Sequence, residues 1–480
     1  MSASKICVPV CERELDALRN ACERAVEWAD LIELRLDCLE RVPENLTEVL
    51  QNLSVPVVLT FRPSEQGGHS YLSREERLNF WNNVAPLGEQ IWWDVEGDLA
   101  NEISPDWSHV IVSHHDFSGV PDDLDDIYKR LAATPAKVVK IAVQSQDIVD
   151  CIPVFKLLDL DEREVIPIAM GNAGVATRVL GPSRGAFLTY GSIDDENATA
   201  PGQLTARNLR SLYNIDKIDN ETIVCGLIGL PVMHSVSPQI HNGWFASQGV
   251  NGVYLPFEVK DLDAFLKRMV HPRTRELNWN LRGLSVTAPH KQTAMKYLDW
   301  LNPAAQEIGA VNTILVKPDR LLGFNTDAAG FINPLLGKFK SWTSRRVAII
   351  GAGGAARAAI WALQNLNVVA TIFARNLDKA QPLAESFGVS CEQLASASFR
   401  DYDLVVNTTP LGSGAYIDQS PVTAEQLNGV RCAYDLIYNP ADTRFLREAR
   451  SAGCDTIGGL EMLVAQAKLQ FELWTGKRPG

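Results

Sequence analysis

The sequence predicts an α/β protein built from two regions, and three features of the chain support this fold class. Strand-like and helix-like segments alternate through the first part of the chain. A polar stretch at 214–221 interrupts the alternation, and a second alternating region follows it. Within that second region a hydrophobic strand runs directly into a glycine-rich turn and a helix. A chain of 480 residues has room for about three domains of ordinary size.

Eight hydrophobic runs in the first region are expected to form strands, at 6–10, 31–36, 55–61, 90–95, 109–114, 137–143, 164–170 and 186–190. Helix-like stretches lie between them, for example at 13–28, 74–83, 124–133 and 147–158. Eight strand–helix units within about 200 residues have the length and rhythm of a (β/α)8 barrel. A doubly wound open sheet would show the same alternation, so both arrangements remain open at this point.

Lys140 stands out in this region because it lies inside the apolar run 137–143, where a buried strand is expected. Burying an ammonium group is costly. Two interpretations are therefore open. The side chain points away from the sheet and reaches water, or its amine is kept neutral and forms an imine with a carbonyl substrate.

Other polar residues fall at the ends of predicted strands. Glu33 and Arg35 lie on the second run, and Arg62 follows the third. Asp94 ends the fourth run, and His115 follows the fifth. Because the C-terminal ends of barrel strands carry the active site, these side chains are expected to meet at one mouth of a barrel.

A nucleotide-binding fingerprint is present in the second region. A strand at 345–350 leads into the glycine-rich turn, and a helix follows to residue 366. Glycines in such a turn let the backbone approach a pyrophosphate, whose charge meets the helix N-terminus. The expected cofactor contacts in the turn are Gly351, Ala352, Gly353, Gly354, Ala355 and Ala356.

The end of the next strand, at 368–373, selects between nucleotides. A carboxylate there would bind the ribose hydroxyls of NAD, whereas this chain has Arg375, Asn376 and, one turn further, Lys379. Positive charge suits a 2′-phosphate, so NADP(H) is the expected cofactor. The alternative is that both cations are solvated surface residues.

Small polar side chains mark several turns upstream of the fingerprint, namely Ser235, Ser237, Thr287 and Asn312. Such groups suit a ligand with several hydroxyls, because each hydroxyl can donate and accept a hydrogen bond. Lys291 and Asp327 would form an acid–base pair beside a carbonyl group that awaits hydride. Taken alone, each of these residues is more simply explained as a turn residue or a helix cap.

The composition argues against some classes of partner. A net charge of −13 is the opposite of the clustered positive charge that nucleic acids and anionic membranes attract. The nine cysteines include no CxxC pair and no histidine at metal-ligand spacing, which predicts free thiols in a reducing cytoplasm and no metal site. Neither a signal segment nor a membrane span is expected. The oligomeric state does not follow from the sequence.

Taken in order, the motifs of residues 223–480 resemble shikimate dehydrogenase. The shared motifs are Ser-x-Ser-Pro at 235–238, Val-Thr-x-Pro-x-Lys at 286–291, Gly-Ala-Val-Asn-Thr at 309–313, Asn-Thr-Asp at 325–327, the glycine-rich turn, and the segments 435–438 and 459–466. The resemblance implies that Lys291 and Asp327 are catalytic. It also implies substrate contacts from Ser235, Ser237, Thr287, Asn312, Tyr438 and Gln466. The chain departs from the family at Ser285, where Asn is common, and at Val236, where Lys is usual.

Residues 1 to about 213 are similar to type I 3-dehydroquinate dehydratase, a (β/α)8 barrel that works through an imine. The similarity rests on the segments 33–37, 60–62, 113–117, 139–142 and 199–203 and on Arg178. It implies that Lys140 forms the imine and that His115, rather than His114, is the general acid and base. The substrate contacts it implies are Glu33, Arg35, Arg62, Arg178, Thr199 and Gln203.

Two positions depart from the dehydratase pattern. Gln66 stands where the family usually has a glutamate that is thought to orient the histidine, so dehydratase turnover is expected to be lower. Glu65 could take that role if the loop shifts by one residue. Thr199 replaces the usual serine and keeps the hydroxyl.

The two halves together resemble bifunctional dehydratase–dehydrogenases, which implies conversion of 3-dehydroquinate to 3-dehydroshikimate and then, with NADPH, to shikimate. The expected parts are a barrel at 1–213, a linker at 214–221, a substrate-binding lobe at 222–327, a Rossmann lobe at 328–457 and a C-terminal helix at 458–480 that returns to the substrate lobe. Two alternatives stay open: a quinate-using dehydrogenase with a weak dehydratase half, or a non-catalytic metabolite sensor. The four catalytic candidates and the lack of a basic DNA-binding segment argue against a sensor.

Overall fold

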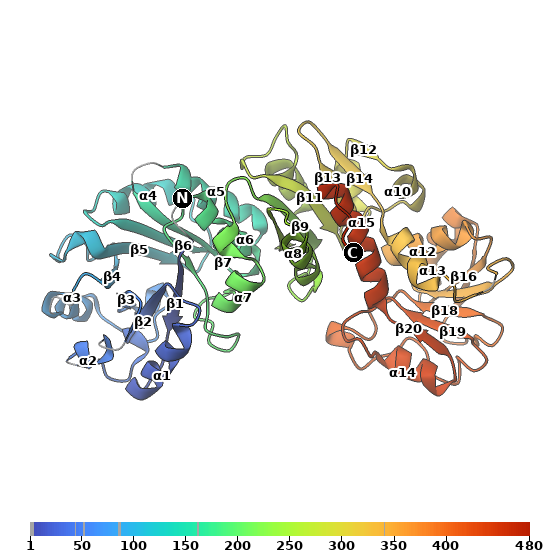
Figure 1. The fold of residues 1–480 in the computed structure, drawn as a ribbon, viewed down its shortest axis with the longest axis horizontal. Coiled ribbons are helices and arrows are strands. Elements are labelled where there is room, and N and C mark those ends of the chain that lie inside the picture. The colour runs from blue at the N-terminus through green and yellow to red at the C-terminus, as the bar shows by residue number, and fades with distance from the viewer. Residues whose placement is uncertain (1–3, 44, 51–52, 85–87, 161–162, 340) are drawn as a thin grey trace. The chain divides into compact units, whose positions relative to one another are not determined.

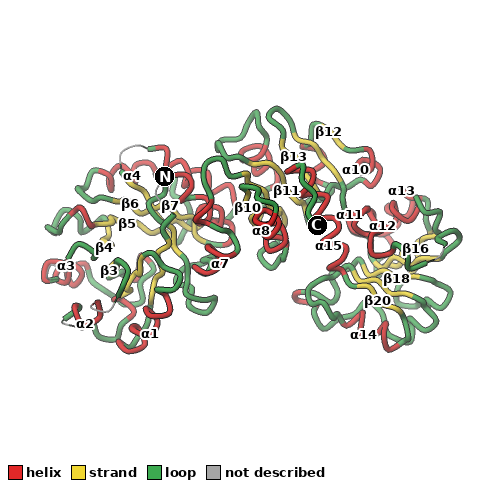
Figure 2. The backbone as a smooth tube through the Cα atoms, in the orientation of Figure 1, coloured by secondary structure: helices red, strands yellow, loops and turns green. Residues whose placement is uncertain are grey.

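A computed structural model describes residues 4–43, 45–50, 53–84, 88–160, 163–339 and 341–480 (Figure 1). The chain divides into two compact units, Met1–Leu281 and Arg282–Gly480. Strands and helices alternate in both units (Figure 2), which confirms the predicted α/β class. Within the described ranges, no helix is both long enough and apolar enough to span a membrane.

The first unit begins with a near-closed parallel barrel. Its strands are β1 (Ile6–Val10), β2 (Leu31–Arg35), β3 (Val57–Thr60), β4 (Ile91–Glu96), β5 (Val110–Asp116), β6 (Val138–Gln144), β7 (Glu164–Met170) and β8 (Thr189–Tyr190). They are hydrogen-bonded in the order β7-β6-β5-β4-β3-β2-β1-β8. At the seam between the outer two strands, the Phe187 amide donates to the Val165 carbonyl oxygen at 2.8 Å. The predicted (β/α)8 barrel is therefore confirmed, and the open-sheet alternative is wrong.

Helices connect the barrel strands. They are α1 (Leu15–Ala25), α2 (Thr47–Leu50), α3 (Arg74–Asn83), α4 (Leu124–Ala132), α5 (Cys151–Lys156), α6 (Val175–Leu180) and α7 (Ala206–Ser211). Helix α3 has the predicted bounds because Ser73 and Glu76 form a capping box at its start. The helix expected at 147–158 is shorter than predicted. A 3-10 turn, Ile148–Asp150, precedes α5, and Pro153 lacks the amide that would extend the α-helix toward the N-terminus.

Side chains of alternating strand residues fill the inside of the barrel. One buried cluster contains Val138 and Ala142 of β6, together with residues of the neighbouring strands. Lys140 lies between these two residues in the sequence, so its side chain points to the same face of the strand. The β6 lysine is therefore directed into the barrel.

The rest of the first unit contains β9 (Ile223–Gly229), α8 (Ser237–Ser247), β10 (Gly252–Glu258) and α9 (Leu262–Phe265). Strands β9 and β10 pair in parallel, with Val224 opposite Val253. The segment 214–221, predicted as a linker, includes the 3-10 turn Ile215–Lys217, and Ile215 is buried. The polar composition of this stretch therefore does not prevent it from packing against its neighbours.

The second unit first forms a small mixed sheet and then a parallel one. Its early elements are β11 (Leu281–Val286), β12 (Trp300–Leu301), α10 (Pro303–Ile308), β13 (Thr313–Val316), β14 (Leu321–Phe324) and α11 (Asp327–Ile332). Strand β13 pairs antiparallel with both β11 and β14. Strand β12 pairs in parallel with β14.

The parallel sheet has the order β17-β16-β15-β18-β19-β20. Its elements are β15 (Arg346–Ile350), α12 (Gly354–Gln364), β16 (Val369–Ala374), α13 (Leu377–Phe387), β17 (Ser390–Gln393), β18 (Leu404–Asn407), β19 (Cys432–Asp435), α14 (Arg444–Ser451) and β20 (Asp455–Ile457). Val347 and Ile349 join one core cluster, and Ala348 and Ile350 join another, so both faces of β15 are buried. The strand order reverses at β15, which creates the crevice where this kind of sheet binds nucleotides.

The chain ends in a long helix, α15 (Gly459–Thr475), which packs within the second unit. Gln470 Nε2 donates to the Asn312 carbonyl oxygen at 3.1 Å, and Trp474 Nε1 donates to the Ile314 carbonyl oxygen at 3.2 Å. A Cβ on Gly330 of α11 would lie 2.7 Å from the Gln466 Cβ. Close contact between α11 and α15 therefore brings Gln466 next to the start of β13.

The prediction that all nine cysteines are free thiols is wrong for two of them. Cys11 and Cys38 form a disulfide, with their Cα atoms 5.4 Å apart. Cys11 follows β1 and Cys38 follows β2, and these strands are parallel neighbours. The strand pairing therefore joins residues that are 27 positions apart in the sequence. The other seven cysteines, all within the described ranges, form no disulfide.

Candidate functional sites

One pocket opens at the C-terminal end of the barrel strands. Its lining includes all eight barrel residues predicted to act on a substrate: Glu33, Arg35, Arg62, His115, Lys140, Arg178, Thr199 and Gln203. His114 does not line this pocket, whereas His115 does. Strands β5 and β6 pair with Ser113 opposite Lys140 and His115 opposite Ala142, so the predicted base and the predicted imine lysine come from adjacent strands.

Lys140 is buried, with 4 % of its surface exposed, so the interpretation in which it reaches water is wrong. Its Nζ donates to Asp94 Oδ2 at 2.8 Å and to the Tyr190 hydroxyl at 3.0 Å, and Glu33 Oε1 lies 3.6 Å away. The ammonium also lies over the Tyr190 ring, 4.2 Å from its centroid. These contacts hold the amine in one place at the floor of the pocket.

Asp94 and Tyr190 contact Lys140, and the sequence motifs predict neither contact. Burial alone would raise the pKa of Asp94, but the Arg62 and Lys140 cations lower it well below its usual range. Burial and the nearby Glu33 carboxylate raise the pKa of the Tyr190 hydroxyl well above its usual range, so it stays protonated. Asp94 is predicted from the sequence to lie at the barrel mouth but is given no role there, and the interior position of Tyr190 depends on the register of the short strand β8.

His115 has the protonation state that a general base needs. Burial and the nearby Arg62 and Lys140 cations lower the pKa of its imidazole well below the usual range, so the ring is neutral. Among the described residues, its Nδ1 has no hydrogen-bond partner. Gln66 Oε1 instead accepts a hydrogen bond from the His115 backbone amide at 3.1 Å. Gln66 therefore contacts the main chain of the histidine and, being neutral, adds no negative charge beside the ring.

The alternative in which Glu65 orients the histidine finds no support in the geometry. Gln66 lines the pocket, whereas Glu65 is exposed. Both residues belong to a 3-10 turn, Ser64–Gln66, which ends at Gly67 with a φ of 82°. The turn directs only the second of the two side chains toward His115.

Replacing Gln66 by glutamate is expected to increase dehydratase turnover. A carboxylate in the pocket would raise the pKa of His115 toward its usual range and stabilise the imidazolium that forms when the ring takes a proton. An increase of about tenfold in kcat corresponds to ~1.4 kcal/mol of added stabilisation. The pH profile of kcat/KM should also change, with its acidic limb moving to higher pH because the base is then protonated more readily.

The exposed neighbour supplies the matched control, since Glu65→Gln removes a carboxylate from the same turn without touching the pocket. An unchanged pH profile in the Gln66→Glu variant, measured by the appearance of the enone product, would show that residue 66 does not control the imidazole.

Arg35 is held in a fork by Asp37. Its Nε and Nη2 donate to the two carboxylate oxygens of Asp37 at 2.9 and 2.8 Å, and Nη2 also donates to the Gly67 carbonyl oxygen at 3.1 Å. Burial alone would raise the pKa of Asp37, but hydrogen bonding and charge from Arg35 lower it. The pair fixes a guanidinium at the rim of the pocket.

Arg62 and Arg178 are both buried, but their surroundings differ. Arg62 forms ion pairs with Asp94 at 2.8 Å and with Glu96 at 2.9 Å. For Arg178, the structure gives a single hydrogen bond, to the Pro201 carbonyl oxygen at 3.5 Å, and its Nε is without a partner among the described residues. Burial lowers the pKa of Arg178 to about 10. A buried cation without an anion is costly, so Arg178 is the arginine of this pocket that is ready to bind a carboxylate.

The loop after β8 carries the last two predicted residues. Gln203 Oε1 accepts hydrogen bonds from the Thr199 amide at 2.9 Å and from the Thr199 hydroxyl at 3.3 Å. Gly202 has a φ of 66°, and a Cβ there would lie 2.2 Å from the Gly171 carbonyl carbon. The glycine lets this loop pass close to the end of β7, which keeps Thr199 and Gln203 at the mouth of the barrel.

In the second unit, Lys291 and Asp327 form the predicted pair. Lys291 Nζ donates to Asp327 Oδ2 at 2.5 Å. Asn312 Nδ2 donates to Asp327 Oδ1 at 2.8 Å and lies 3.2 Å from Gln466 Oε1. Asp327 is the first residue of α11, so its carboxylate also benefits from the helix N-terminus. The lysine, the aspartate, the asparagine and the glutamine form one continuous network.

The other predicted contacts of the second half are distributed between the two units. Ser235 donates to Ser237 at 3.1 Å in the first unit. Thr287 and Tyr438 are half-buried and belong to the second unit. Ser285, the family departure, is buried and donates to Gln470 Oε1 at 2.7 Å. Gln470 is buried within α15 and was missed, because helical glutamines carry no distinctive sequence signal.

The glycine-rich turn has the geometry of a nucleotide cradle. Gly351 has a φ of 112°, and a Cβ there would lie 2.7 Å from Thr408 Oγ1, so only glycine fits. A Cβ on Gly353 would meet nothing within 4 Å, and no side chain caps the helix that begins at Gly354. Gly354 lies against Lys291, whose Cδ would be 3.2 Å from an added Cβ. The turn and the catalytic candidate are therefore neighbours.

The strand that follows ends in exposed positive charge. Arg375, Asn376 and Lys379 are all exposed, and Asn376 Oδ1 caps α13 by accepting from the Lys379 amide at 3.0 Å. The residue that follows β16 is thus a cation, which fits a 2′-phosphate. The backbone cradle and this cation fit an NADP-type dinucleotide.

Comparisons with known proteins match separate family models to the barrel and to the region that follows it. The family model for type I 3-dehydroquinase matches residues 6–220, and that for the shikimate dehydrogenase substrate binding domain matches residues 227–314. The models for shikimate / quinate 5-dehydrogenase and for the shikimate 5′-dehydrogenase C-terminal domain match residues 335–422 and 459–480.

Three relatives illustrate the similarity. The bifunctional 3-dehydroquinate dehydratase/shikimate dehydrogenase of Arabidopsis thaliana, named as chloroplastic, is 34% identical over 98% of this chain and 82% of its own length. The shikimate dehydrogenase (NADP(+)) of Caldanaerobacter subterraneus subsp. tengcongensis is 40% identical over 54% of this chain and 94% of its own. A crystal structure of shikimate dehydrogenase in complex with NADP+ superimposes with a TM-score of 0.51 at 39% identity, covering 55% of this chain and 93% of that one.

The barrel with its buried lysine, the nucleotide cradle with its lysine–aspartate pair, and a relative that spans nearly the whole sequence lead to one conclusion. The chain belongs to the family of bifunctional 3-dehydroquinate dehydratase/shikimate dehydrogenases.

Proposed function

We propose that this chain dehydrates 3-dehydroquinate to 3-dehydroshikimate in the barrel and reduces the product to shikimate with NADPH in its second half. The observation that carries the first step is the buried Lys140 amine, held by Asp94 and Tyr190 in the pocket that His115 and Arg178 also line. An amine in such surroundings suits imine chemistry rather than a structural role.

The dehydration needs an electron sink and a mobile proton. Lys140 Nζ attacks the substrate ketone, and loss of water from the carbinolamine gives a protonated imine. The neutral His115 ring then removes the proton α to the imine carbon, and the electron pair moves into the imine. Expulsion of the β-hydroxyl follows, and His115 returns its proton to the departing oxygen as water. Hydrolysis of the imine releases the enone and restores the lysine.

Substrate orientation is assigned to the cations and polar groups of the rim. Arg178 is proposed to bind the substrate carboxylate, because no described carboxylate forms an ion pair with its guanidinium. Arg35, Glu33, Thr199 and Gln203 are proposed to contact the ring hydroxyls. Arg62 is already paired with two carboxylates, so its proposed role is to hold Asp94 and to keep positive charge near the site.

The reduction needs a hydride and a proton. The glycine-rich turn and Arg375 would hold NADPH, which would supply the hydride when bound. Lys291, paired with Asp327, donates the proton to the oxygen that becomes the new hydroxyl. The substrate hydroxyls and carboxylate are assigned to Ser235, Ser237, Thr287, Asn312, Tyr438 and Gln466.

Cofactor choice gives a separate prediction. The Arg375→Asp variant should raise the KM for NADPH by roughly 10- to 100-fold, because a charge-assisted hydrogen bond to a 2′-phosphate is worth about 1.5–3 kcal/mol. The KM for NADH should change much less. Lys379→Ala serves as the graded comparison, since this cation is one turn further along α13. If initial-rate assays showed the same change in KM for NADPH and for NADH, Arg375 would not bind the 2′-phosphate.

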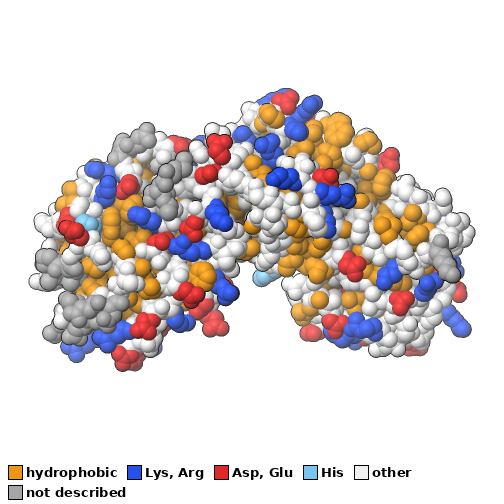
Figure 3. Space-filling view, in the orientation of Figure 1, with side chains coloured by type: hydrophobic (Ala, Val, Ile, Leu, Met, Phe, Trp, Pro, Cys, Tyr) orange, Lys and Arg blue, Asp and Glu red, His pale blue; other side chains and the backbone are white. Residues whose placement is uncertain are grey.

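The partners of this chain are proposed to be small molecules rather than nucleic acid. On the face drawn in Figure 3, lysine and arginine side chains are interspersed with aspartate and glutamate. The net charge of −13 would repel a polyanion. A cytoplasmic location is also proposed, and fractionation of cells would test it.

The test of the whole assignment is a coupled assay. Adding 3-dehydroquinate and NADPH to the full chain should consume NADPH after a short lag, while the enone appears transiently. Without NADPH the enone should accumulate. Tight binding of 3-dehydroquinate with no turnover at either site would overturn the proposal and identify a metabolite-binding protein instead.

A further inference from the structure

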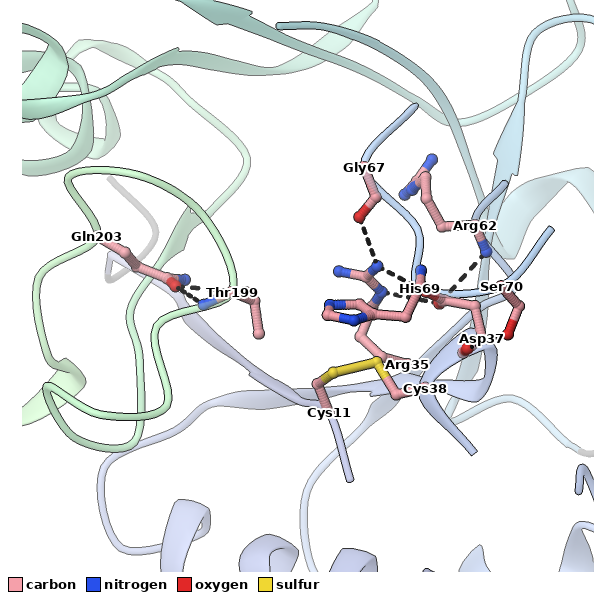
Figure 4. The surroundings of a disulfide bond; sticks show 10 residues. All are labelled: Cys11, Arg35, Asp37, Cys38, Arg62, Gly67, His69, Ser70, Thr199 and Gln203. Carbon is pink, nitrogen blue, oxygen red and sulfur yellow. Dashed lines mark hydrogen bonds and ion pairs between the residues drawn. A yellow bond between two sulfur atoms is a disulfide. The ribbon is translucent and has the colours of Figure 1, made fainter. Parts of the chain in front are cut away.

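The barrel carries a disulfide at the mouth that holds the dehydratase pocket. Cys11 follows β1 and Cys38 closes the 3-10 turn Leu36–Cys38 after β2, so both lie at the C-terminal ends of their strands. Figure 4 shows the sulfur–sulfur bond below His69 and next to Arg35. The two sulfurs and a ring nitrogen of His69 all lie within 4.8 Å of one another.

These two cysteines differ from the other barrel cysteines in their exposure. Cys11 and Cys38 are half-buried, whereas Cys7, Cys22 and Cys151 are buried. Burial raises the pKa of all three of the latter thiols, which makes them poor nucleophiles. A reagent in solution can therefore reach the bonded pair more readily than the core thiols.

A short chain of contacts connects the disulfide to the pocket. Cys38 directly follows Asp37 in a single turn. Asp37 holds the Arg35 guanidinium through two hydrogen bonds and accepts the His69 amide at 3.0 Å. The Asp37 carbonyl oxygen also accepts from the Ser70 hydroxyl at 2.6 Å. The turn at 36–38 thus fixes both Arg35 and the loop that carries Gln66.

We propose that the Cys11–Cys38 disulfide is a reversible redox modification site that sets the substrate affinity of the dehydratase pocket. The inference rests on the proposed dehydratase function of the barrel. In the oxidised chain, the bond ties the turn at 36–38 to the end of β1 and keeps the Arg35–Asp37 fork preorganised. In the reduced chain, the turn loses that tether, and the Arg35 side chain becomes more mobile. Substrate binding must then fix this side chain in one conformation, which costs conformational entropy.

The redox step is an exchange with a small or protein dithiol. One thiolate of the dithiol attacks a sulfur of the pair, the Cys11–Cys38 bond breaks, and a mixed disulfide forms. The second thiol of the reductant then displaces the remaining cysteine, so the reductant leaves as its own disulfide. Cys11 and Cys38 gain two electrons and two protons. The adjacent His69 imidazole can pass a proton to the departing thiolate.

The experiment compares the full chain after equilibration in dithiothreitol or in its oxidised form. Alkylation under denaturing conditions should label nine cysteines in the reduced chain and seven in the oxidised chain. Reduction should raise the KM for 3-dehydroquinate about tenfold, with kcat changed by less than about twofold, since Lys140 and His115 come from other strands. The NADPH-dependent reduction of 3-dehydroshikimate should be the same in both states, and reoxidation should restore the low KM.

Two variants separate this proposal from general damage. The double variant with Cys11→Ser and Cys38→Ser should show the reduced-state KM in every buffer. Cys391→Ser, a half-buried free cysteine of the second unit, should respond to the buffers as the unmodified chain does. Thermal unfolding well above the assay temperature in both states shows that the KM change is not loss of the fold.

Several outcomes would overturn the proposal. Nine labelled cysteines under oxidising conditions would mean that the bond does not form, and identical KM values in both states would mean that it does not affect the pocket. If only Zn²⁺ added to the reduced chain changes KM, and His69→Ala abolishes that change, the three residues are a metal site instead. Absence of turnover in both states would instead be a failure of the proposed function, and the thiol count would still report on the bond.

Discussion

Replacing Lys140 by alanine is expected to reduce dehydratase turnover by at least ~10⁴-fold, because no other lysine is among the described residues that line the pocket. The NADPH-dependent half should keep its full rate. The substitution also leaves Asp94 without its lysine partner, and breaking a buried ion pair costs about 3–5 kcal/mol, so a lower thermal stability of the barrel is expected as well.

Loss of stability and loss of chemistry can be told apart with Lys140→Arg. This variant keeps a cation beside Asp94 but cannot form an imine under assay conditions. It should therefore unfold at a higher temperature than the alanine variant and be equally inactive. Turnover by Lys140→Arg near the level of the unmodified chain would refute imine catalysis by this residue.

Borohydride provides direct chemical evidence for the same assignment. Added together with 3-dehydroquinate, it should reduce the imine and leave a stable adduct on the peptide that contains Lys140. The Lys140→Arg variant is the control and should remain unlabelled. An active chain with Lys140 unmodified after this treatment would place the imine on another residue.

Replacing Lys291 by alanine is expected to lower the rate of 3-dehydroshikimate reduction by about 10³-fold, within the range by which a positioned proton donor accelerates a reaction. Asp327 would lose its 2.5 Å partner but keep its hydrogen bond from Asn312. The dehydratase rate should not change, since neither Lys291 nor Asp327 is among the described residues that line its pocket. Initial rates measured separately with 3-dehydroquinate and with 3-dehydroshikimate give the rates of dehydration and of reduction.

Lys296→Ala is the matched control for this prediction. Lys296 lies five positions further along the same segment and is exposed, and its ammonium lies over the Tyr297 ring. It should leave both rates unchanged. If Lys291→Ala also lost dehydratase activity while staying folded, the two sites would have to be coupled through the chain.

Local patterns were sufficient to predict most of the fold. The alternation of strand-like and helix-like runs predicted all eight barrel strands, and two of them, β1 and β7, have the predicted bounds. Sequence patterns predicted helix bounds less well where a single residue removes a backbone hydrogen bond. At Pro153 the expected long helix becomes a turn and a short helix, because an imino nitrogen cannot donate to the preceding turn.

Roles within the site could be predicted only in part. Both Arg62 and Arg178 were expected to bind a carboxylate or hydroxyls, and nothing in the local sequence distinguishes them. Their difference comes from Asp94 and Glu96, which form ion pairs with Arg62 from the neighbouring strand, whereas no ion pair is found for Arg178 among the described residues. Ion pairs between residues that are distant in the sequence depend on strand order and register, and these cannot be predicted from a single sequence.

By itself, the sequence determined the α/β class and the nucleotide-binding turn, because periodicity and glycine-rich turns are local consequences of backbone geometry. The choice of a barrel over an open sheet, and of a dehydrogenase, came from the resemblance of its motifs to known families. The sequence also supplied Lys140, His115, Lys291 and Asp327 as the residues able to carry the chemistry. Only the tertiary structure decided their surroundings. Asp94 and Tyr190, 46 and 50 positions away from Lys140, meet it inside the barrel, and Cys11 and Cys38 are joined at its mouth. These contacts depend on which strands are neighbours, and that is settled when the whole barrel buries its core.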